Sequence, residues 1–321
     1  MNLKYPDLFN PGYIGSLKIR NRIVMAPIDS KYRTENGAIN ERHRYYLGAR
    51  AKGGVGLIIM DNVAVEYPRG SVGVKAARID QDRFIPFLNE TVEEVHFWGA
   101  SIIAQLCHAG RQTSLAATQG KQLVSSSAIS YEGSGTIPKE LSINEIGNFV
   151  NLFTEAARRA KIAGFDGVEV HAAHGYLLSS FLSPALNHRN DEYGGSIANR
   201  ARIVVQIIKS IKKCLGKEFV VLVRFNCRDG IPGGILPPES VELALIFEKA
   251  GADALNISAG TYESPSWTFP PMMEPEGLLI PDIIPIKEAV VIPVMGVGKI
   301  STPSYANQII VPHDLYHVLL M

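Results

Sequence analysis

Apolar residues, many of them β-branched, recur in short runs that are separated by longer stretches with helical spacing. The runs that predict buried strands are Ile23–Ala26, Val55–Met60, Ser101–Leu106, Gly167–His171, Phe219–Arg224, Ala254–Ser258 and Ile292–Gly296. The stretches that predict helices between them are 41–52, 82–98, 142–163, 198–213 and 239–250. Strand and helix therefore alternate, and this order is typical of a parallel sheet with right-handed crossovers.

Helix boundary signals support this alternation. Ser142 and Glu145 have the S-x-x-E spacing of a capping box, and Gly164 ends the apolar periodicity that follows. Thr302 and Pro303 place a cap and a first-turn proline after the seventh strand, which predicts a further helix there.

We expect one (β/α)8 barrel over residues 1–321. Residues 1–22 predict a short hairpin that plugs the barrel bottom, because turn residues at Pro11-Gly12 and Gly15 interrupt alternating apolar positions. The long excursions 107–141, 174–197 and 259–280 follow strands, as the loops of barrel enzymes do. A doubly wound sheet should show G-x-G-x-x-G after its first strand, and this chain has none there.

Amino-acid composition argues against several classes of partner and location. The chain has 46% apolar residues and a net charge of +1, so no basic field predicts nucleic-acid binding. Its three cysteines are far apart and form no disulfide framework or CxxC knuckle, which favours a cytoplasmic location. We expect no membrane span, because no apolar run approaches 18 residues.

The densest candidate chemistry follows the fourth strand. Glu169 and His171 alternate on one side of that strand, and His174 and Tyr176 lie just beyond its carboxyl end. Together the two histidines and the tyrosine could bind an oxygen atom and deliver a proton. The open alternatives are satisfied structural side chains, or a metal site built from Glu169, His171 and His174.

Other polar residues lie at the carboxyl ends of neighbouring predicted strands. Gln105 ends the third strand and Arg224 ends the fifth, where a buried arginine needs an anionic or carbonyl partner. The open alternative for Arg224 is an internal ion pair with Glu169 or Asp229. Met295-Gly-Val-Gly298 ends the seventh strand, and its glycines would let backbone N–H groups approach a phosphate.

Several motifs together resemble the Old Yellow Enzyme family of FMN-dependent ene-reductases. They are Asn21-Arg-Ile-Val-Met-Ala-Pro27, Ala51-Lys-Gly-Gly-Val-Gly-Leu57, Gln105-Leu-Cys-His-Ala-Gly-Arg111 and the run 169–196. Gly260-Thr-Tyr-Glu-Ser-Pro265 and Pro270-Pro-Met272 look more like its 2,4-dienoyl-CoA reductase and enoate reductase branch. The resemblance implies a barrel that holds FMN at its mouth and uses NAD(P)H to reduce an activated C=C bond.

The resemblance also implies residue roles. His171 and His174 would hold the substrate oxygen, and Tyr176 would protonate the α-carbon. The implied FMN contacts near strand ends are Ala26, Pro27, Ile28, Asn62, Gln105, Arg224, Val297 and Gly298. The implied partner is a small unsaturated carbonyl, carboxylate or thioester.

This sequence departs from the family pattern in three places. Asp29 stands where a small polar or thiol residue is usual, and a carboxylate there would disfavour an anionic reduced flavin. Asn62 stands where Gly or Ala is expected. Residues 311–321 are atypical: 313–321 could form the eighth strand, but no Gly-Arg pair or helix follows, so we expect an incomplete eighth βα unit.

Three further expectations follow from these departures. No cysteine cluster matches the iron–sulfur centre of the longer branch, so we expect no such cluster in this chain. A partly uncovered barrel would favour a homo-oligomer. The alternatives to an ene-reductase are a degenerate barrel that binds FMN weakly without turnover, and a metal-dependent barrel lyase or hydrolase.

Overall fold

The computed structural model describes residues 4–131, 133–313 and 316–319. Eight parallel strands form a closed ring in the order β3-β4-β6-β9-β10-β11-β12-β13, and β13 pairs back to β3. The strands are β3 (Ile23–Met25), β4 (Leu57–Ala64), β6 (Ser101–Cys107), β9 (Gly167–Ala172), β10 (Val220–Asn226), β11 (Ala254–Ser258), β12 (Val294–Gly296) and β13 (Tyr316–Leu319). The predicted (β/α)8 barrel is confirmed.

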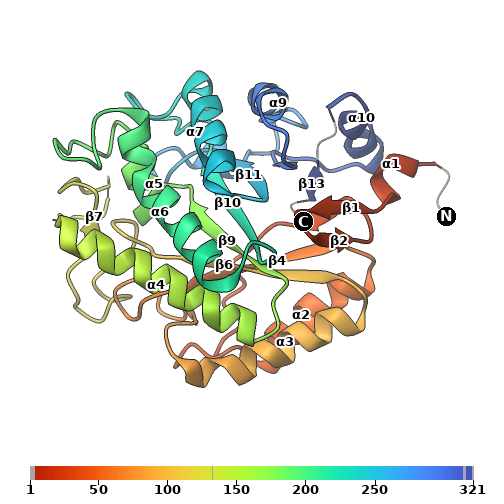
Figure 1. The fold of residues 1–321 in the computed structure, drawn as a ribbon, viewed down its shortest axis with the longest axis horizontal. Helices are drawn as coiled ribbons and strands as arrows, with labels where there is room; N and C mark the ends of the chain where they lie inside the picture. Colours follow the sequence, from red (N-terminus) through yellow and green to blue (C-terminus); the bar gives the residue numbers. More distant parts are fainter. Residues whose placement is uncertain (1–3, 132, 314–315, 320–321) are drawn as a thin grey trace.

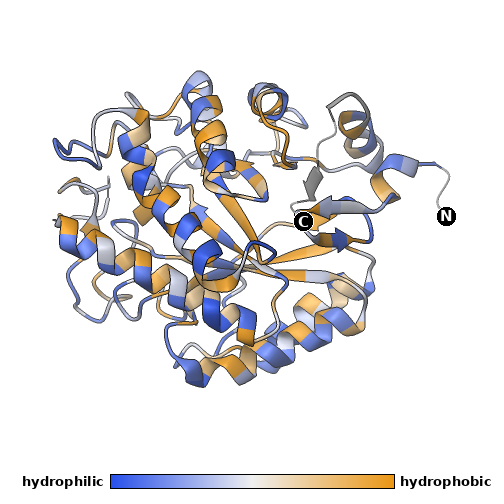
Figure 2. Ribbon diagram, viewed as in Figure 1, coloured by the Kyte–Doolittle hydropathy of each residue, from blue (hydrophilic) through white to orange (hydrophobic). Residues whose placement is uncertain are grey.

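Helices connect successive strands and cover the outside of the ring (Figure 1). They are α2 (Glu41–Lys52), α3 (Ile85–Phe97), α4 (Ile143–Ile162), α6 (Ile197–Leu215), α7 (Pro237–Ala250), α9 (Ile280–Ala289) and α10 (Pro303–His313). Apolar colour concentrates on the strands and on the inner helix faces, while polar residues face outward (Figure 2). Among the described residues, no helix has the length and apolarity needed to cross a bilayer.

The eighth strand is the element that sequence patterning left least certain. Tyr316 pairs with Met295 of β12, and Leu319 pairs with Met25 of β3, so the ring closes at backbone level. A strand edge left open at this point, which an incomplete eighth unit could have caused, is therefore not observed. The sequence ends two residues after this strand.

Two helices fall where the sequence pattern predicted no helix. Helix α9 carries Pro281 in its first turn and Pro285 inside it, and interior proline removes a backbone hydrogen bond and normally argues against a helix. Helix α5 (Leu177–Leu182) begins directly after Tyr176, which gives no side-chain cap. Both form because tertiary packing buries them; all six residues of α5 are buried.

The N-terminal segment lies at the amino-terminal end of the ring. The hairpin of β1 (Gly12–Ile14) and β2 (Leu17–Ile19) is antiparallel, and Ile14 and Ile19 are fully buried. Ser16 Oγ donates to the carbonyl of Glu218, just before β10 begins, at 2.8 Å. The preceding helix α1 (Pro6–Phe9) lies against α10, where Leu8 N–H donates to Asn307. A hairpin thus stands within residues 1–22, and its role as a plug of the barrel bottom stays a prediction.

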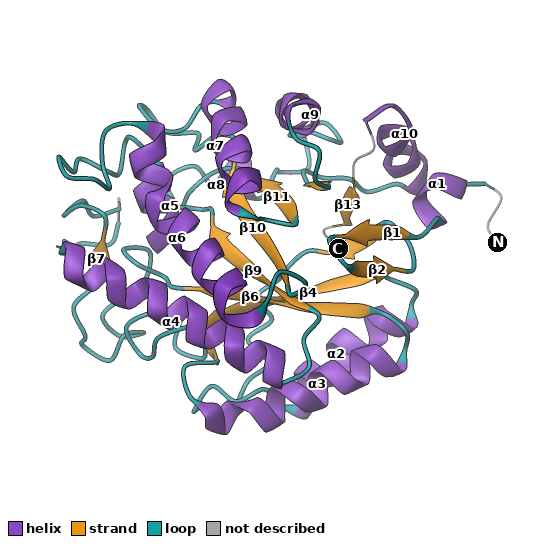
Figure 3. Cartoon of the chain, viewed as in Figure 1, coloured by secondary structure: helices purple, strands orange, loops and turns teal. Residues whose placement is uncertain are grey.

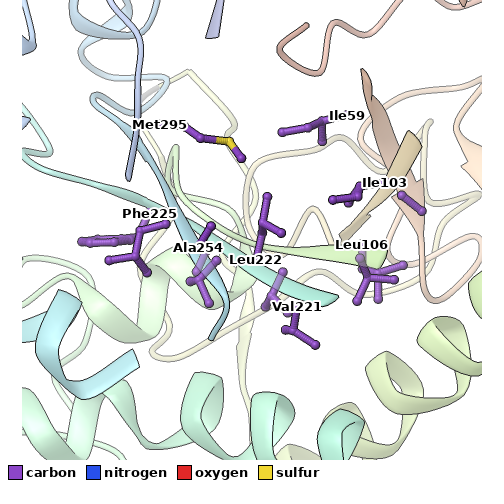
Figure 4. Packing of buried hydrophobic residues seen from close by; sticks show 14 of the residues in the cluster. Ile59, Ile103, Leu106, Val221, Leu222, Phe225, Ala254 and Met295 are labelled. Atoms are coloured by element: carbon purple, nitrogen blue, oxygen red, sulfur yellow. The ribbon is translucent and has the colours of Figure 1, made fainter. Parts of the chain in front are cut away.

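Short strands and helices lie within the loops (Figure 3). They are β5 (Ala77–Arg78), the 3-10 turn Asp82–Phe84, β7 (Val124–Ser125), β8 (Lys139–Glu140) and α8 (Pro265–Thr268). The buried core is apolar, and Figure 4 shows part of it, including Ile59, Leu222 and Met295. Phe225 on β10 stacks edge-on with Phe247 of α7, with ring centroids 5.3 Å apart. This packing fixes the strand ends that carry the polar residues.

Candidate active site

The barrel interior becomes polar toward the carboxyl ends of its strands. On β10, Leu222 lies on the same side as Arg224, and on β11 Ala254 lies on the same side as Asn256, because alternate residues share a face. Glu169 on β9 is the centre of this polar layer and is fully buried. Its carboxylate accepts hydrogen bonds from Gln105 Nε2 and Asn256 Nδ2, each at 2.8 Å.

Glu169 and Arg224 form a buried charge pair without a direct hydrogen bond among those observed. Burial raises the pKa of the Glu169 carboxyl, and the charge of Arg224 together with the two amide hydrogen bonds opposes that rise. Burial likewise lowers the pKa of Arg224, opposed by the charge of Glu169. Each charge thus makes burial of the other tolerable.

Above this layer lies a cavity of about 520 Å³, a size suited to a small ligand. Its lining residues come from the ends of several strands and the loops after them: Pro27, Ile28, Asp29, Lys31, Asn62, Val72, Gln105, His171, His174, Tyr176, Arg224, Tyr262, Thr268 and Phe269. Eight of these lining residues are predicted catalytic or FMN-binding residues, and Asp29, the departure from the family pattern, is a ninth that the sequence analysis named. The structure thus brings together the predicted proton donors and most of the predicted flavin contacts.

Three predicted contacts lie outside the cavity lining. Ala26 directly follows β3 and is fully buried. Val297 and Gly298 follow β12 at the same end of the barrel, and Val297 is buried. Gly298 has φ +116°, and a Cβ there would lie 3.0 Å from Leu279 N, so the backbone needs glycine. The role of this glycine turn in phosphate binding stays a prediction.

Hydrogen bonding indicates the tautomers of the two histidines. The Ala173 N–H donates to His171 Nδ1 at 3.3 Å, which leaves the Nε2–H of a neutral ring free to donate. His174 Nε2 lies 2.7 Å from Ser258 Oγ. Because Arg224 Nη2 donates to that hydroxyl oxygen at 3.3 Å, the hydroxyl can donate to His174 Nε2, and His174 Nδ1–H becomes the free donor.

Both histidines are held neutral. Burial lowers the pKa of His171 and of His174 well below the usual value, and the charge of Arg224 lowers both further. Their rings meet edge-on, with centroids 5.1 Å apart. Two neutral N–H donors therefore stand side by side, which is an arrangement suited to holding one oxygen atom.

The backbone of His174 is in an unusual conformation that neighbouring side chains stabilise. Its φ is +64°, in the left-handed region that few non-glycine residues adopt. Its N–H donates to Asn226 Oδ1 at 3.2 Å, and Gln112 Nε2 donates to its carbonyl. Strain held by surrounding contacts is typical of functional sites.

Tyr176 lies beside the histidines with its hydroxyl in the cavity. Its ring meets His171 edge-on at 5.1 Å between centroids, and its hydroxyl lies 2.9 Å from the hydroxyl of Tyr262. Burial raises the pKa of Tyr176 well above its usual value, so the phenol stays protonated and can act as a proton donor.

The unusual carboxylate of Asp29 lines the cavity, but it is paired. It contacts Lys31, and Arg33 Nη1 lies 2.7 Å from it. Arg33 also contacts the buried carboxylate of Asp61, which lies 3.4 Å from His43 Nε2. Two carboxylates therefore face two basic side chains, and the cavity carries little net negative charge from this cluster.

The residues present fit a flavin. Arg224 Nε and Asn62 Oδ1 are buried and have no hydrogen-bond partner within the described residues. A donor and an acceptor left unpaired at one cavity wall suit the pyrimidine edge of a flavin, which carries carbonyl groups and an N–H. Asn62 occupies a bulge of β4, where the register shifts between Met60 and Val63. Its φ of +27° is a positive value that favours glycine and that asparagine tolerates better than most other residues.

The metal-site alternative finds no support. In the part of the chain that the structure describes, no three His, Cys, Asp or Glu side chains gather so that they could hold a metal ion. Glu169 points into the amide pair of Gln105 and Asn256, whereas His174 is turned toward Ser258.

The sequence analysis gave no role to several lining residues, namely Lys31, Val72, Tyr262, Thr268 and Phe269. Lys31, Val72, Tyr262 and Phe269 lie in loops and Thr268 ends the short helix α8, so no periodicity relates these residues to one another. Tyr262 shows the difficulty: its N–H donates to Gln112 Oε1 at 3.3 Å, and that residue lies 150 positions earlier. The advance signals were the motif Gly260-Thr-Tyr-Glu-Ser-Pro265, which contains Tyr262, and the long excursion 259–280, which contains Tyr262, Thr268 and Phe269.

Comparison with known proteins agrees with this geometry. The profile of the NADH:flavin oxidoreductase / NADH oxidase family matches residues 7–315. The chain is 43% identical over 306 residues to an NADH oxidase of Thermoanaerobacter brockii, covering 95% of this chain and 47% of that protein. It is 36% identical over 330 residues to a cinnamate reductase of Clostridium sporogenes, covering 97% of this chain and 50% of that protein.

Solved structures show the same likeness. The structure of the Old Yellow Enzyme homologue of Zymomonas mobilis matches with a TM-score of 0.82 at 28% identity, covering 98% of this chain and 88% of that one. The chain spans about half the length of the two curated relatives named above. It belongs to the NADH:flavin oxidoreductase / NADH oxidase family, as the resemblance to Old Yellow Enzyme implied.

Proposed function

We propose that this chain is the FMN-binding barrel of an ene-reductase that uses NAD(P)H to reduce an activated C=C bond. The observation that carries the proposal is one cavity in which two neutral histidine N–H donors and a protonated tyrosine converge beside unpaired polar atoms. The chemistry that FMN supplies when bound is hydride transfer, from NAD(P)H to the cofactor and from the cofactor to the substrate β-carbon.

Gln105 and Arg224 would hold the pyrimidine edge of the cofactor. Arg224 would donate through its unpaired Nε, and its positive charge would favour negative charge on the reduced ring. Asn62 Oδ1 would accept from the ring N–H. Pro27 and Ile28 line the cavity and would cover one part of the ring with apolar surface.

His171 and His174 would bind the carbonyl or carboxylate oxygen of the substrate. Their N–H groups are fixed before substrate arrives, since each ring nitrogen that faces the protein already has a partner. As the β-carbon gains hydride, negative charge develops on the oxygen, and prearranged donors stabilise that charge most strongly in a buried site.

Tyr176 would give its hydroxyl proton to the α-carbon. Hydride at one carbon and this proton at the other complete the saturated product, and the tyrosinate that remains must recover a proton before the next turnover. We propose alkene reduction as the activity of the whole protein, NAD(P)H as its reductant and an activated alkene as its substrate. An unsaturated carbonyl, carboxylate or thioester meets the chemistry, and the cinnamate reductase relative is named for one such acid.

The test is anaerobic stopped-flow kinetics on protein loaded with FMN. Tyr176→Phe should leave reduction by NADH or NADPH within about two-fold of wild type but slow alkene reduction by roughly 10²-fold or more, because general acids contribute about that much. Tyr45→Phe on the exposed surface of α2 is the control and should change neither rate. Equal losses in both half-reactions would exclude the proton-donor role, and no alkene reduction by wild type would overturn the proposal.

A further inference from the structure

Tyr176 is poorly placed to recover a proton directly from water. Only 6% of the residue is exposed, and its ring packs against His171 and His174. A tyrosinate at this depth would be costly, since burial raises the pKa of Tyr176 and the neighbouring Tyr262 and Asp29 raise it further. Proton supply to this hydroxyl therefore needs a route.

Tyr262 offers that route. Its hydroxyl lies 2.9 Å from the Tyr176 hydroxyl, and either oxygen can donate. Tyr262 as a whole is 44% exposed, although it also lines the cavity. The two phenols therefore form a short hydrogen-bonded path from a buried oxygen to a side chain in contact with solvent.

The loop that carries Tyr262 is anchored at this residue and at the next one. Gln112 Oε1 accepts from the Tyr262 N–H at 3.3 Å, and Gln112 Nε2 donates to the carbonyl of His174. The next residue, Glu263, forms an ion pair with the fully buried side chain of Arg111. One glutamine thus ties Tyr262 to the catalytic loop, so the distance between the two phenols is set by the scaffold.

We propose that Tyr262 is a proton-relay residue that passes a proton from solvent to Tyr176 during alkene reduction. The inference rests on the proposed function and goes beyond it. As the Tyr176 O–H bond breaks and its proton bonds to the α-carbon, the Tyr262 O–H bond breaks and its proton bonds to the Tyr176 oxygen. Water or a buffer acid then returns one proton to Tyr262. No electron moves in this relay, and the net result is one solvent proton delivered to the product.

The competing explanation is that Tyr262 only positions the Tyr176 ring. A relay moves two protons in one step, so the rate of alkene reduction should depend on the solvent deuterium fraction along a curve. A positioning contact leaves one proton in motion, which gives a straight line. The two roles therefore differ in the shape of the proton inventory as well as in rate.

The experiment compares Tyr262→Phe with Tyr131→Phe, which is matched because the Tyr131 ring stacks edge-on against Tyr262 at 5.8 Å. Tyr262→Phe should keep FMN content and the rate of reduction by NAD(P)H, slow alkene reduction by roughly ten-fold, and make the inventory linear. Tyr131→Phe should match wild type in all four. Alkene reduction in Tyr262→Phe within two-fold of wild type, or slower with an unchanged curved inventory, would overturn the relay.

A second readout needs neither cofactor nor turnover. In protein labelled with [¹³Cζ]tyrosine, Tyr262→Phe should move the Tyr176 resonance, because the phenol loses its hydrogen-bond partner, while Tyr131→Phe should not. If the Tyr176 resonance does not move in Tyr262→Phe, the hydrogen bond between the two phenols is absent and the relay is overturned. If the wild-type protein reduces no activated alkene but the Tyr176 resonance does move, the proposed function is refuted. The contact between the two hydroxyl groups is then still demonstrated.

Discussion

Replacing Arg224 by methionine would leave a buried carboxylate without its counter-charge. Glu169 is fully buried and Arg224 is 5% exposed, so water cannot replace the lost charge. Breaking a buried pair by removing one partner costs about 3–5 kcal/mol. The amides of Gln105 and Asn256 still donate to Glu169. We therefore expect the lower end, about 3 kcal/mol, which is a large share of a typical stability of about 5–15 kcal/mol.

The cost should depend on pH in a defined direction. The pKa of Glu169 is raised in the folded protein, and removing Arg224 should raise it further. A carboxyl with a raised folded pKa destabilises the fold only where the unfolded chain would be ionised. The penalty is thus absent below the unfolded pKa of about 4.3, grows as pH rises, and is complete above the folded pKa.

Urea unfolding of the apoprotein at pH 5 and pH 8 measures this penalty without interference from FMN binding. Arg224→Met should lose more stability at pH 8 than at pH 5, and adding Glu169→Gln should restore most of the loss. Arg158→Met, which breaks a surface pair with Glu155, is the control and should cost less than about 1 kcal/mol. Equal losses at both pH values, or no recovery in the double variant, would refute the reasoning.

Three further predictions concern other parts of the molecule. The pKa values of His171 and His174 are depressed, so these residues stabilise the fold above about pH 6.5 and that stability is lost on acidification. Replacing both histidines with glutamine should therefore make the free energy of unfolding fall less steeply between pH 7 and pH 5. Asp29→Asn leaves Arg33 with one fewer anionic partner, so the reduction potential of bound FMN should rise, which spectroelectrochemistry would detect. Ser142→Ala removes a capping-box hydroxyl and should cost about 1 kcal/mol in thermal unfolding, whereas an unchanged Tm would contradict the cap.

Much of the fold could be predicted because buried strands and amphipathic helices repeat with fixed periods. The predicted bounds of β11 and α2 agree with the structure residue for residue. Helix α9 was missed because Pro285 argues locally against a helix, and only packing of buried residues such as Ile283 and Ile286 outweighs that signal. Strand β13 had no distinctive pattern, and its pairing with β3 is a long-range contact that local sequence does not encode.

Some residues of the site could likewise be predicted from the sequence, and others could not. Gln105, His171 and Arg224 could be identified because they end strands, and the carboxyl ends of barrel strands converge at one face. Tyr262 could not be placed, since its position depends on Gln112. The pairing of Asp29 was equally hidden, because sequence spacing does not show whether a carboxylate turns toward a nearby base.

The central claim is that this barrel binds FMN in the cavity above Glu169. Its most direct test is the visible absorption spectrum of the purified chain, with the FMN released by heat counted per protomer. We expect a yellow protein with about one FMN per chain, and loss of most of that FMN in Arg224→Met. A colourless protein that takes up little or no FMN even when the cofactor is added would contradict the claim.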